Sequence, residues 1–322
     1  MPHKDIWNAW HGCKKCSEGC RNCYMYFLDE KRGVQTPSSV CHKTGKFNYP
    51  ISKSRDKQYK IKSGERLRVN MTSDTFLEDA DAWREDFWKI IRTRSDVIFW
   101  ILTKRPERFS TCLPSDWGDG YPNVSMNITC ENQEMFDKRI GYLLSTPAKH
   151  KGLCLAPLLS DIDITPALAS GQIEEVCVGG ENYNNPRVCC YEWVKHIADT
   201  CAAYKINFCW YETGTLLSVN GAITCAPLKQ TQSINAFFAG LNQHYYDPIY
   251  DLRYEDGTPV PTDALRERKF NLNHCLFCSN QDMCDGCTNC GGCGPTNIVS
   301  WAEFRQIQYD KLVDMYKDRK EP

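Results

Sequence analysis

Four cysteines lie close together near the start of the chain, at Cys13, Cys16, Cys20 and Cys23. The last three follow the spacing C-x3-C-x2-C. A four-iron cluster normally takes one thiolate per iron. Three thiolates on one short loop therefore leave one iron open, and a small molecule with amino and carboxylate groups can chelate that iron. The spacing predicts an iron–sulfur cluster that acts on a bound cofactor.

A structural zinc ion is the alternative for this loop, because four thiolates can close a tetrahedral site. Zinc sites usually pair two C-x2-C units across a gap of more than about ten residues. Here only three residues separate Cys16 from Cys20, which is crowded for a tetrahedron. The spacing therefore favours the iron–sulfur cluster.

A second cysteine cluster lies near the other end of the chain. Its members are Cys275, Cys278, Cys284, Cys287, Cys290 and Cys293. The last four are one residue short of the bacterial ferredoxin spacing. They predict an auxiliary iron–sulfur cluster that relays electrons or binds substrate. Zinc held by Cys275, Cys278 and one later pair is the lesser alternative, because six thiolates exceed the need of one zinc ion.

The composition agrees with metal chemistry in a reducing compartment. The chain has 322 residues, of which 25% are charged and 42% hydrophobic, as in a folded globular protein. It has no apolar run of about 20 residues and no secretory signal, so we expect a cytoplasmic protein without membrane contact. In that compartment its 20 cysteines point to metal or catalysis more than to disulfides. Isolated cysteines such as Cys154 and Cys177 are expected in the core.

One segment departs from the near-neutral formal charge of −1. Residues 43–68 hold many more basic than acidic side chains. We interpret the segment as a solvated loop surface. A patch for a phosphate-bearing substrate is the functional alternative.

Hydrophobic periodicity predicts alternating strands and helices up to about residue 215. The expected strands are Arg66–Met71, Asp96–Leu102, Asn123–Ile128, Gly152–Pro157, Glu175–Val178 and Ile206–Tyr211. The expected helices are Asp81–Thr93, Gln133–Leu144 and Tyr191–Tyr204, with a terminal amphipathic helix at Trp301–Tyr316.

Strict alternation of short strands and helices predicts an α/β fold with a parallel sheet, closed into a full or partial (β/α) barrel. We place this core at residues 1–215 and a C-terminal extension at residues 216–322, which holds the auxiliary cluster. Polar residues follow most of the strands. In such barrels the chemistry lies at the carboxyl ends of the strands.

The first cluster and the strand ends together resemble the phage-associated, radical-SAM-like family of three-cysteine-motif proteins, long described only as a domain of unknown function. The likeness runs from Ile6 to about Gly214 and includes Thr103-Lys-Arg-Pro-Glu-Arg108 and Val178-Gly-Gly-Glu181. The family's cysteines match Cys13, Cys20 and Cys23, with a small or apolar residue where Cys16 stands. The first ligand is therefore Cys13 by family and Cys16 by the commoner spacing. Ala156 stands where the family often has a glutamate.

The resemblance implies a radical SAM barrel and a role for each polar strand end in binding S-adenosylmethionine (SAM). Ser73 and Asp74 would receive the SAM ammonium group, and Lys104 or Arg105 would hold its carboxylate or a substrate anion. The remaining implied cofactor-binding residues are Asn127, Thr129 and Glu131 for the ribose, Gly179 and Gly180 for close approach of the backbone to the adenine or methionine, and Glu181 beside them.

The resulting expectation is a radical SAM enzyme. Its [4Fe-4S] cluster would cleave SAM to a 5′-deoxyadenosyl radical that abstracts hydrogen from an unidentified substrate. Such an enzyme needs an electron donor of flavodoxin or ferredoxin type, and a further protein partner is compatible with the extension. The alternative is a non-catalytic, zinc-stapled module that binds nucleic acid through residues 43–68.

Overall fold

The computed structural model describes residues 6–261, 269–271 and 298–300. Contacts divide the chain into two compact units, Ile6–Ala264 and a second unit of Met1–Asp5 with Leu265–Pro322. In the second unit the described residues are two antiparallel strands, β13 (Lys269–Asn271) and β14 (Ile298–Ser300). The second cysteine cluster and the predicted terminal helix lie outside the described residues. The predicted boundary at residue 215 lies inside the first unit. The assignment of the radical SAM site to residues 1–215 and of the auxiliary cluster to residues 216–322 stays a prediction.

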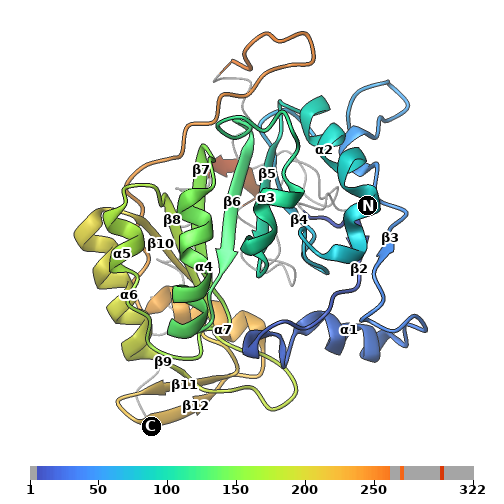
Figure 1. The fold of residues 1–322 in the computed structure, drawn as a ribbon. Coiled ribbons are helices and arrows are strands. Elements are labelled where there is room, and N and C mark those ends of the chain that lie inside the picture. The colour runs from blue at the N-terminus through green and yellow to red at the C-terminus, as the bar shows by residue number, and fades with distance from the viewer. Residues whose placement is uncertain (1–5, 262–268, 272–297, 301–322) are drawn as a thin grey trace. The chain divides into compact units, whose positions relative to one another are not determined.

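The first unit is built on a curled sheet of seven parallel strands that forms an open half-barrel (Figure 1). In spatial order the strands are β1 (Ile6–Trp7), β4 (Arg66–Val69), β5 (Ile98–Thr103), β6 (Val124–Thr129), β7 (His150–Leu155), β8 (Glu175–Gly179) and β10 (Asn207–Glu212). The α/β class and the partial barrel are therefore confirmed. All six predicted strands are present with ends within about two residues. The edge strand β1 was not predicted, because two residues carry no periodicity.

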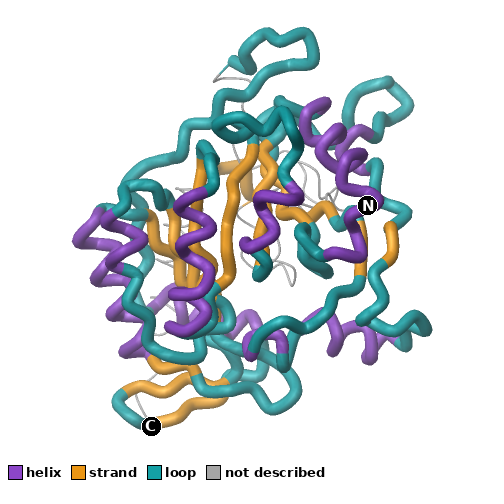
Figure 2. Tube along the Cα trace, in the orientation of Figure 1, coloured by secondary structure: helices purple, strands orange, loops and turns teal. Residues whose placement is uncertain are grey.

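The helices between residues 84 and 204 cover the outer side of the sheet (Figure 2), whereas the first and the last helix of this unit lie apart from that layer. Seven α-helices are described in this unit. They are α1 (Tyr24–Arg32), α2 (Arg84–Thr93), α3 (Phe109–Cys112), α4 (Gln133–Ser145), α5 (Thr165–Ala169), α6 (Tyr191–Tyr204) and α7 (Lys229–Phe238). The three helices predicted in this region are confirmed, although α2 begins only after a 3-10 helix at Glu78–Trp83. Shorter 3-10 helices span Glu18–Cys20, Tyr49–Ile51 and Pro106–Arg108. The remaining strands are β2 (Trp10–His11), β3 (His42–Lys43), β9 (Cys189–Cys190), β11 (Leu216–Val219) and β12 (Ala222–Cys225).

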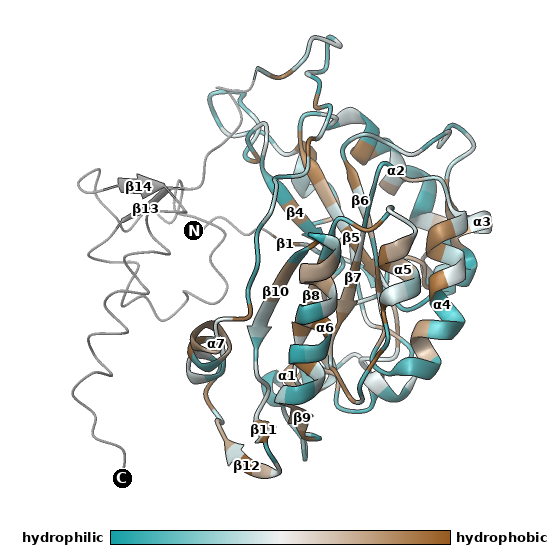
Figure 3. Ribbon diagram, turned by 90° about the vertical axis from the view of Figure 1, so that its left-hand side faces the viewer, coloured by the Kyte–Doolittle hydropathy of each residue, from teal (hydrophilic) through white to brown (hydrophobic). Residues whose placement is uncertain are grey.

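The outer face of the sheet carries the hydrophobic core. Successive strand residues point to opposite faces, so Leu67, Phe99 and Met126 share the outer face with the apolar sides of the helices. Figure 3 shows this hydrophobic layer along the strands, with hydrophilic turns of α4 facing outward. Trp7 stacks on Phe87 of α2 at 4.9 Å between ring centroids, which ties β1 to this layer.

The concave face is polar and sulfur-rich. Cys154, Cys177 and Cys209 occupy one register row across β7, β8 and β10. Cys154 is buried but lies outside the main hydrophobic cluster, and Cys177 is only half-buried. The prediction that both are ordinary core residues was therefore wrong for Cys177, because it faces the concave side. Tyr211 on the same face is 40% exposed.

Within the described residues, the structure has no helix that is both long enough and apolar enough to cross a membrane.

Candidate functional site at the carboxyl edge of the sheet

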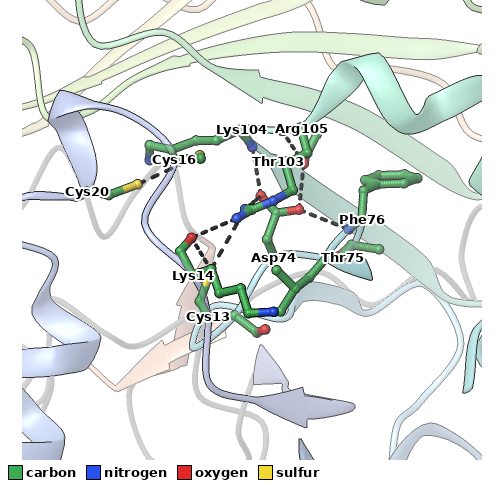
Figure 4. Close-up of polar contacts among 12 residues, drawn as sticks. Cys13, Lys14, Cys16, Cys20, Asp74, Thr75, Phe76, Thr103, Lys104 and Arg105 are labelled. Carbon is green, nitrogen blue, oxygen red and sulfur yellow. Dashed lines mark hydrogen bonds and ion pairs between the residues drawn. The ribbon is translucent and has the colours of Figure 1, made fainter. Parts of the chain in front are cut away.

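The four N-terminal cysteines lie on one loop that follows β1 and β2 and leads into α1. We call residues 12–23 the cysteine loop. The strands are parallel, so their carboxyl ends meet at one edge of the sheet. The cysteine loop passes along this edge, beside the residues that follow β4 and β5 (Figure 4). The predicted N-terminal cysteines and the predicted residues Asp74, Lys104 and Arg105 are therefore brought together in the folded chain.

The thiols are not arranged as a closed site for one metal ion. The Cys16 and Cys20 sulfurs are 4.0 Å apart, while the Cys13 sulfur lies 3.9 Å from Arg105 Nη1. A zinc ion with bonds of about 2.3 Å needs all its sulfurs within about 4 Å of one another. Among the described residues no group of three or more His, Cys, Asp or Glu side chains is gathered around a single ion position. All four cysteines of the loop are free thiols.

The thiols differ in electrostatic setting. A hydrogen bond from Cys16 lowers the pKa of Cys20 to about 4. Burial raises the pKa of Cys13 to about 12, with a further contribution from Asp74. Burial also raises the pKa of Cys23. The loop therefore holds one thiol inclined to ionise beside two that burial keeps neutral in the metal-free protein.

Lys104 brings a partly buried cation to this edge. Burial lowers its pKa, but the negative charges of Cys20 and Glu131 outweigh burial and raise it, so the ammonium group stays charged at neutral pH. Its Nζ makes no hydrogen bond or ion pair with any residue that the structure describes. The predicted role for Lys104 in holding an anion is compatible with this geometry.

Asp74 is already saturated by its own chain. Its Oδ1 accepts from Thr103 Oγ1 at 2.6 Å and from the Phe76 amide at 2.9 Å. Its Oδ2 accepts from the Lys104 amide at 2.9 Å and from Arg105 Nη1 at 3.2 Å (Figure 4). Asp74 is 5% exposed. The carboxylate therefore joins the ends of β4 and β5, and it has little capacity left for a ligand's ammonium group.

Other predicted ligands also face the protein. Ser73 Oγ donates to the Gly12 carbonyl at 2.5 Å, and Glu131 Oε1 accepts from the Gly19 amide at 3.0 Å. Glu181 Oε2 accepts from Asn22 Nδ2 at 2.9 Å. Each of the three thus contacts the cysteine loop.

Unsatisfied acceptors and hydroxyls lie near the same edge. Asn127 donates to the Ile101 carbonyl at 3.1 Å, yet its Oδ1 is buried without a partner among the described residues, as is Thr72 Oγ1. Thr129 is 1% exposed, and its carbonyl accepts from Arg139 at 2.7 Å. A buried polar atom without a partner is costly, so Thr72 and Asn127 are the polar atoms here with capacity for a ligand.

Gly179 and Gly180 were predicted to let the backbone approach the cofactor closely. In the structure they allow the close approach of Tyr211 and Thr213, at the end of the neighbouring strand β10. A Cβ at Gly179 would lie 2.4 Å from the Tyr211 ring, and one at Gly180 would lie 2.1 Å from the Thr213 carbonyl oxygen. The glycines therefore let β8 and β10 pack tightly.

Sequence reasoning missed Gly19, Asn22, Arg139 and Arg187, all of which form this edge. Gly19 and Asn22 had a usable signal, because they stand between cysteines of a proposed metal loop. Arg139 is 4% exposed inside α4, and a buried arginine on a helix looks like any surface arginine in the sequence.

The basic segment 43–68 is mostly loop, and its lysines are exposed as predicted, but Arg66 and Arg68 stand half-buried in β4. Lys43 Nζ lies 3.8 Å from the Phe47 ring centroid, and Lys53 Nζ lies 4.5 Å from that of Tyr59. These contacts occupy individual lysines, and the phosphate-binding interpretation stays untested.

Comparison with known proteins places the chain without assigning an activity. The family described as "Protein of unknown function (DUF5131)" matches residues 3–257. The search of curated proteins and the search of solved structures each gave no match.

Proposed function

The chain belongs to the DUF5131 family of proteins of unknown function, and on that premise we propose that it is a radical SAM enzyme. One observation carries the proposal: a four-cysteine loop at the carboxyl edge of a parallel half-barrel, beside a charged lysine whose Nζ makes no hydrogen bond or ion pair with the described residues. When bound, a [4Fe-4S] cluster with SAM supplies an electron that cleaves the sulfonium and generates a 5′-deoxyadenosyl radical. The radical SAM type of the barrel is part of this proposal.

The residues present fit these groups. Cys13, Cys20 and Cys23 would supply three thiolates and leave one iron for SAM. The backbone of Cys13 is fixed on both sides, because its amide donates to the Ser38 carbonyl at 2.9 Å and its carbonyl accepts from the Tyr26 hydroxyl. Cys16, in contrast, is exposed. We therefore favour Cys13 over Cys16 as the first ligand.

Three further side chains would orient SAM. The Lys104 ammonium has the charge to hold the SAM carboxylate, and Thr72 Oγ1 and Asn127 Oδ1 are the buried polar atoms that lack partners among the described residues. Asp74 and Arg105 would act by fixing Lys104 through the bond from its amide to Asp74. An electron donor of flavodoxin or ferredoxin type completes the proposal, with a substrate still to be identified.

The test is a comparison of single cysteine variants in anaerobically purified protein. Cys13→Ser, Cys20→Ser and Cys23→Ser should each lose the N-terminal cluster and 5′-deoxyadenosine formation from SAM under reducing conditions. Cys16→Ser is the matched control on the same loop and should keep both. Full iron content together with SAM cleavage in Cys20→Ser would refute the radical SAM proposal. If Cys16→Ser loses the cluster and Cys13→Ser keeps it, the first cluster ligand is Cys16 and not Cys13.

A further inference from the structure

The cysteine loop contains no regular structure except the 3-10 helix at Glu18–Cys20. Ordering such a segment costs about 1–2 kcal/mol per residue in backbone entropy, so contacts from outside the loop must hold it. We propose that three carboxylate–arginine pairs at the strand ends hold the loop in its metal-binding shape before any metal is present. The inference rests on the proposed function only in naming the loop as the metal site.

The first pair is Asp74 with Arg105, which follow β4 and β5. Their side chains are 3.2 Å apart and only 6% and 7% exposed. Arg105 Nη2 donates to the Lys14 carbonyl at 2.7 Å. This pair therefore fixes the backbone directly after Cys13.

The second pair is Glu131 with Arg139, which follow β6. Oε2 of Glu131 lies 2.7 Å from Arg139 Nη1, and the carboxylate is fully buried. Its Oε1 accepts from the Gly19 amide at 3.0 Å. A Cβ at Gly19 would lie 2.9 Å from Glu131 Cδ, so glycine is required for this approach. This pair fixes the backbone directly before Cys20.

The third pair is Glu181 with Arg187, which follow β8. Glu181 Oε2 accepts from Arg187 Nε at 2.9 Å and from Asn22 Nδ2 at 2.9 Å. Arg187 Nη2 donates to the Glu18 carbonyl at 2.9 Å. This pair fixes Glu18, two residues before Cys20, and Asn22, directly before Cys23.

The arrangement is specific to the loop. A buried ion pair is weak support for global stability, because desolvation offsets the attraction. Each of these pairs makes at least one hydrogen bond to the loop, next to a cysteine. The pairs alternate along the sheet at β4, β6 and β8, so they approach the loop from separate places. The three carboxylates are therefore positioning residues that act through the loop, and SAM needs other ligands.

The test uses Arg187→Ala in the metal-free full-length protein. Arg187 is partly exposed, so its removal leaves no large cavity. Arg92→Ala is the matched control, because Arg92 is similarly exposed and pairs with Glu85 at 2.6 Å and Asp116 at 3.1 Å, away from the loop. Amide hydrogen exchange across residues 14–23 should become at least about tenfold faster in Arg187→Ala, as expected when a charged hydrogen bond is lost. Exchange in Arg92→Ala should stay at the wild-type rate across these residues.

A second variant keeps the test decisive if Arg187→Ala does not fold. Asn22→Ala removes only the loop-side donor to Glu181 and should accelerate the same amides. After reconstitution with ferrous iron and sulfide, both loop variants should give a broadened or shifted EPR spectrum of the reduced cluster, with the thermal midpoint near that of the Arg92→Ala control. Unchanged loop exchange in both variants, or equal acceleration in Arg92→Ala, would overturn the inference. If the wild type takes up no iron, the proposed function fails while the exchange result still decides the inference.

Discussion

The polar side chains at the carboxyl edge fall into two groups. Some already make their hydrogen bonds within the protein, and others have hydrogen-bonding atoms that bond to no described residue and are free to bind a ligand. Asp74, Glu131 and Glu181 have the charge expected of SAM ligands, but their oxygens accept from the protein itself. Lys104 has no such partner among the described residues. The charge of a side chain thus identifies it as a candidate SAM ligand. Whether its polar atoms already make hydrogen bonds within the protein decides which candidates can bind SAM.

Lys104→Met should weaken SAM binding by about ten- to a hundredfold, the range expected for one charge-assisted hydrogen bond. Iron content should remain, because lysine is not a cluster ligand. The measurement is equilibrium SAM binding to the reconstituted protein. Lys14→Met is the control, since its ammonium pairs with Asp79 at 2.6 Å on the surface. Equal SAM affinity in wild type and Lys104→Met would remove Lys104 from the cofactor site.

Gly19→Ala should destabilise the protein by about 1–3 kcal/mol, because the new methyl group must displace the buried Glu131. Gly141→Ala in α4 provides the opposite case. Nothing lies within 4 Å of a Cβ there, so alanine should stabilise the helix by about 0.5–1 kcal/mol. Urea unfolding of the metal-free proteins measures both changes. A neutral Gly19→Ala would show that the loop can move away from Glu131.

Secondary structure elements carry these residues to one edge, and much of their placement was predictable. Strand β5 is apolar up to Leu102 and ends at Thr103, where the polar residues Lys104 and Arg105 begin. Such a change from apolar to polar marks a strand end in the sequence. The partners of Asp74 could not be predicted, because Thr103 belongs to the neighbouring strand, and strand order is absent from local sequence patterns. Local sequence patterns also do not show that the Arg139 side chain on α4 points into the protein toward Glu131.

Acid should loosen the contact between the strand ends and the cysteine loop. Burial raises the pKa of Glu131, but Lys104 and Arg139 outweigh it, so the net pKa is lowered. The pKa of Glu181 is likewise lowered, since Arg187 and Asn22 outweigh burial. Carboxylates with lowered pKa stabilise the fold above their unfolded pKa of about 4.3, and this contribution is lost as pH falls through the folded value.

The measurement is urea stability of the metal-free protein between about pH 6 and 3. Glu181→Gln should show a shallower loss with acid than the wild type, because one of the titrating groups is gone. Identical slopes would mean that Glu181 does not contribute to the acid response.

At the scale of the molecule, the described residues that contact the cysteine loop belong to the first compact unit. The second cysteine cluster belongs to the other unit, outside the described residues, and its metal stays a prediction. The two sites are therefore expected to load independently.

Replacing Cys284, Cys287, Cys290 and Cys293 together by serine should remove about four irons per chain and leave the N-terminal cluster assembled. SAM cleavage without substrate should survive, because the first cluster alone can deliver the electron. Iron and zinc analysis of wild type and variant is the measurement. If the wild type contains about four irons and one zinc per chain, the second cysteine cluster is a structural zinc site and not an auxiliary iron–sulfur cluster.

The contacts that close the cysteine loop join residues far apart in the chain: Gly19 with Glu131, separated by 112 positions, and Glu18 with Arg187, separated by 169. A ribosome adding about 5–20 residues per second therefore exposes the loop for on the order of 10 s before its last partner emerges. Throughout that time the nascent chain carries four thiols on a loop that still lacks one of its three carboxylate–arginine pairs. Ordered iron loading is consequently expected only after Arg187 has left the ribosome, while the rest of the chain is still being made.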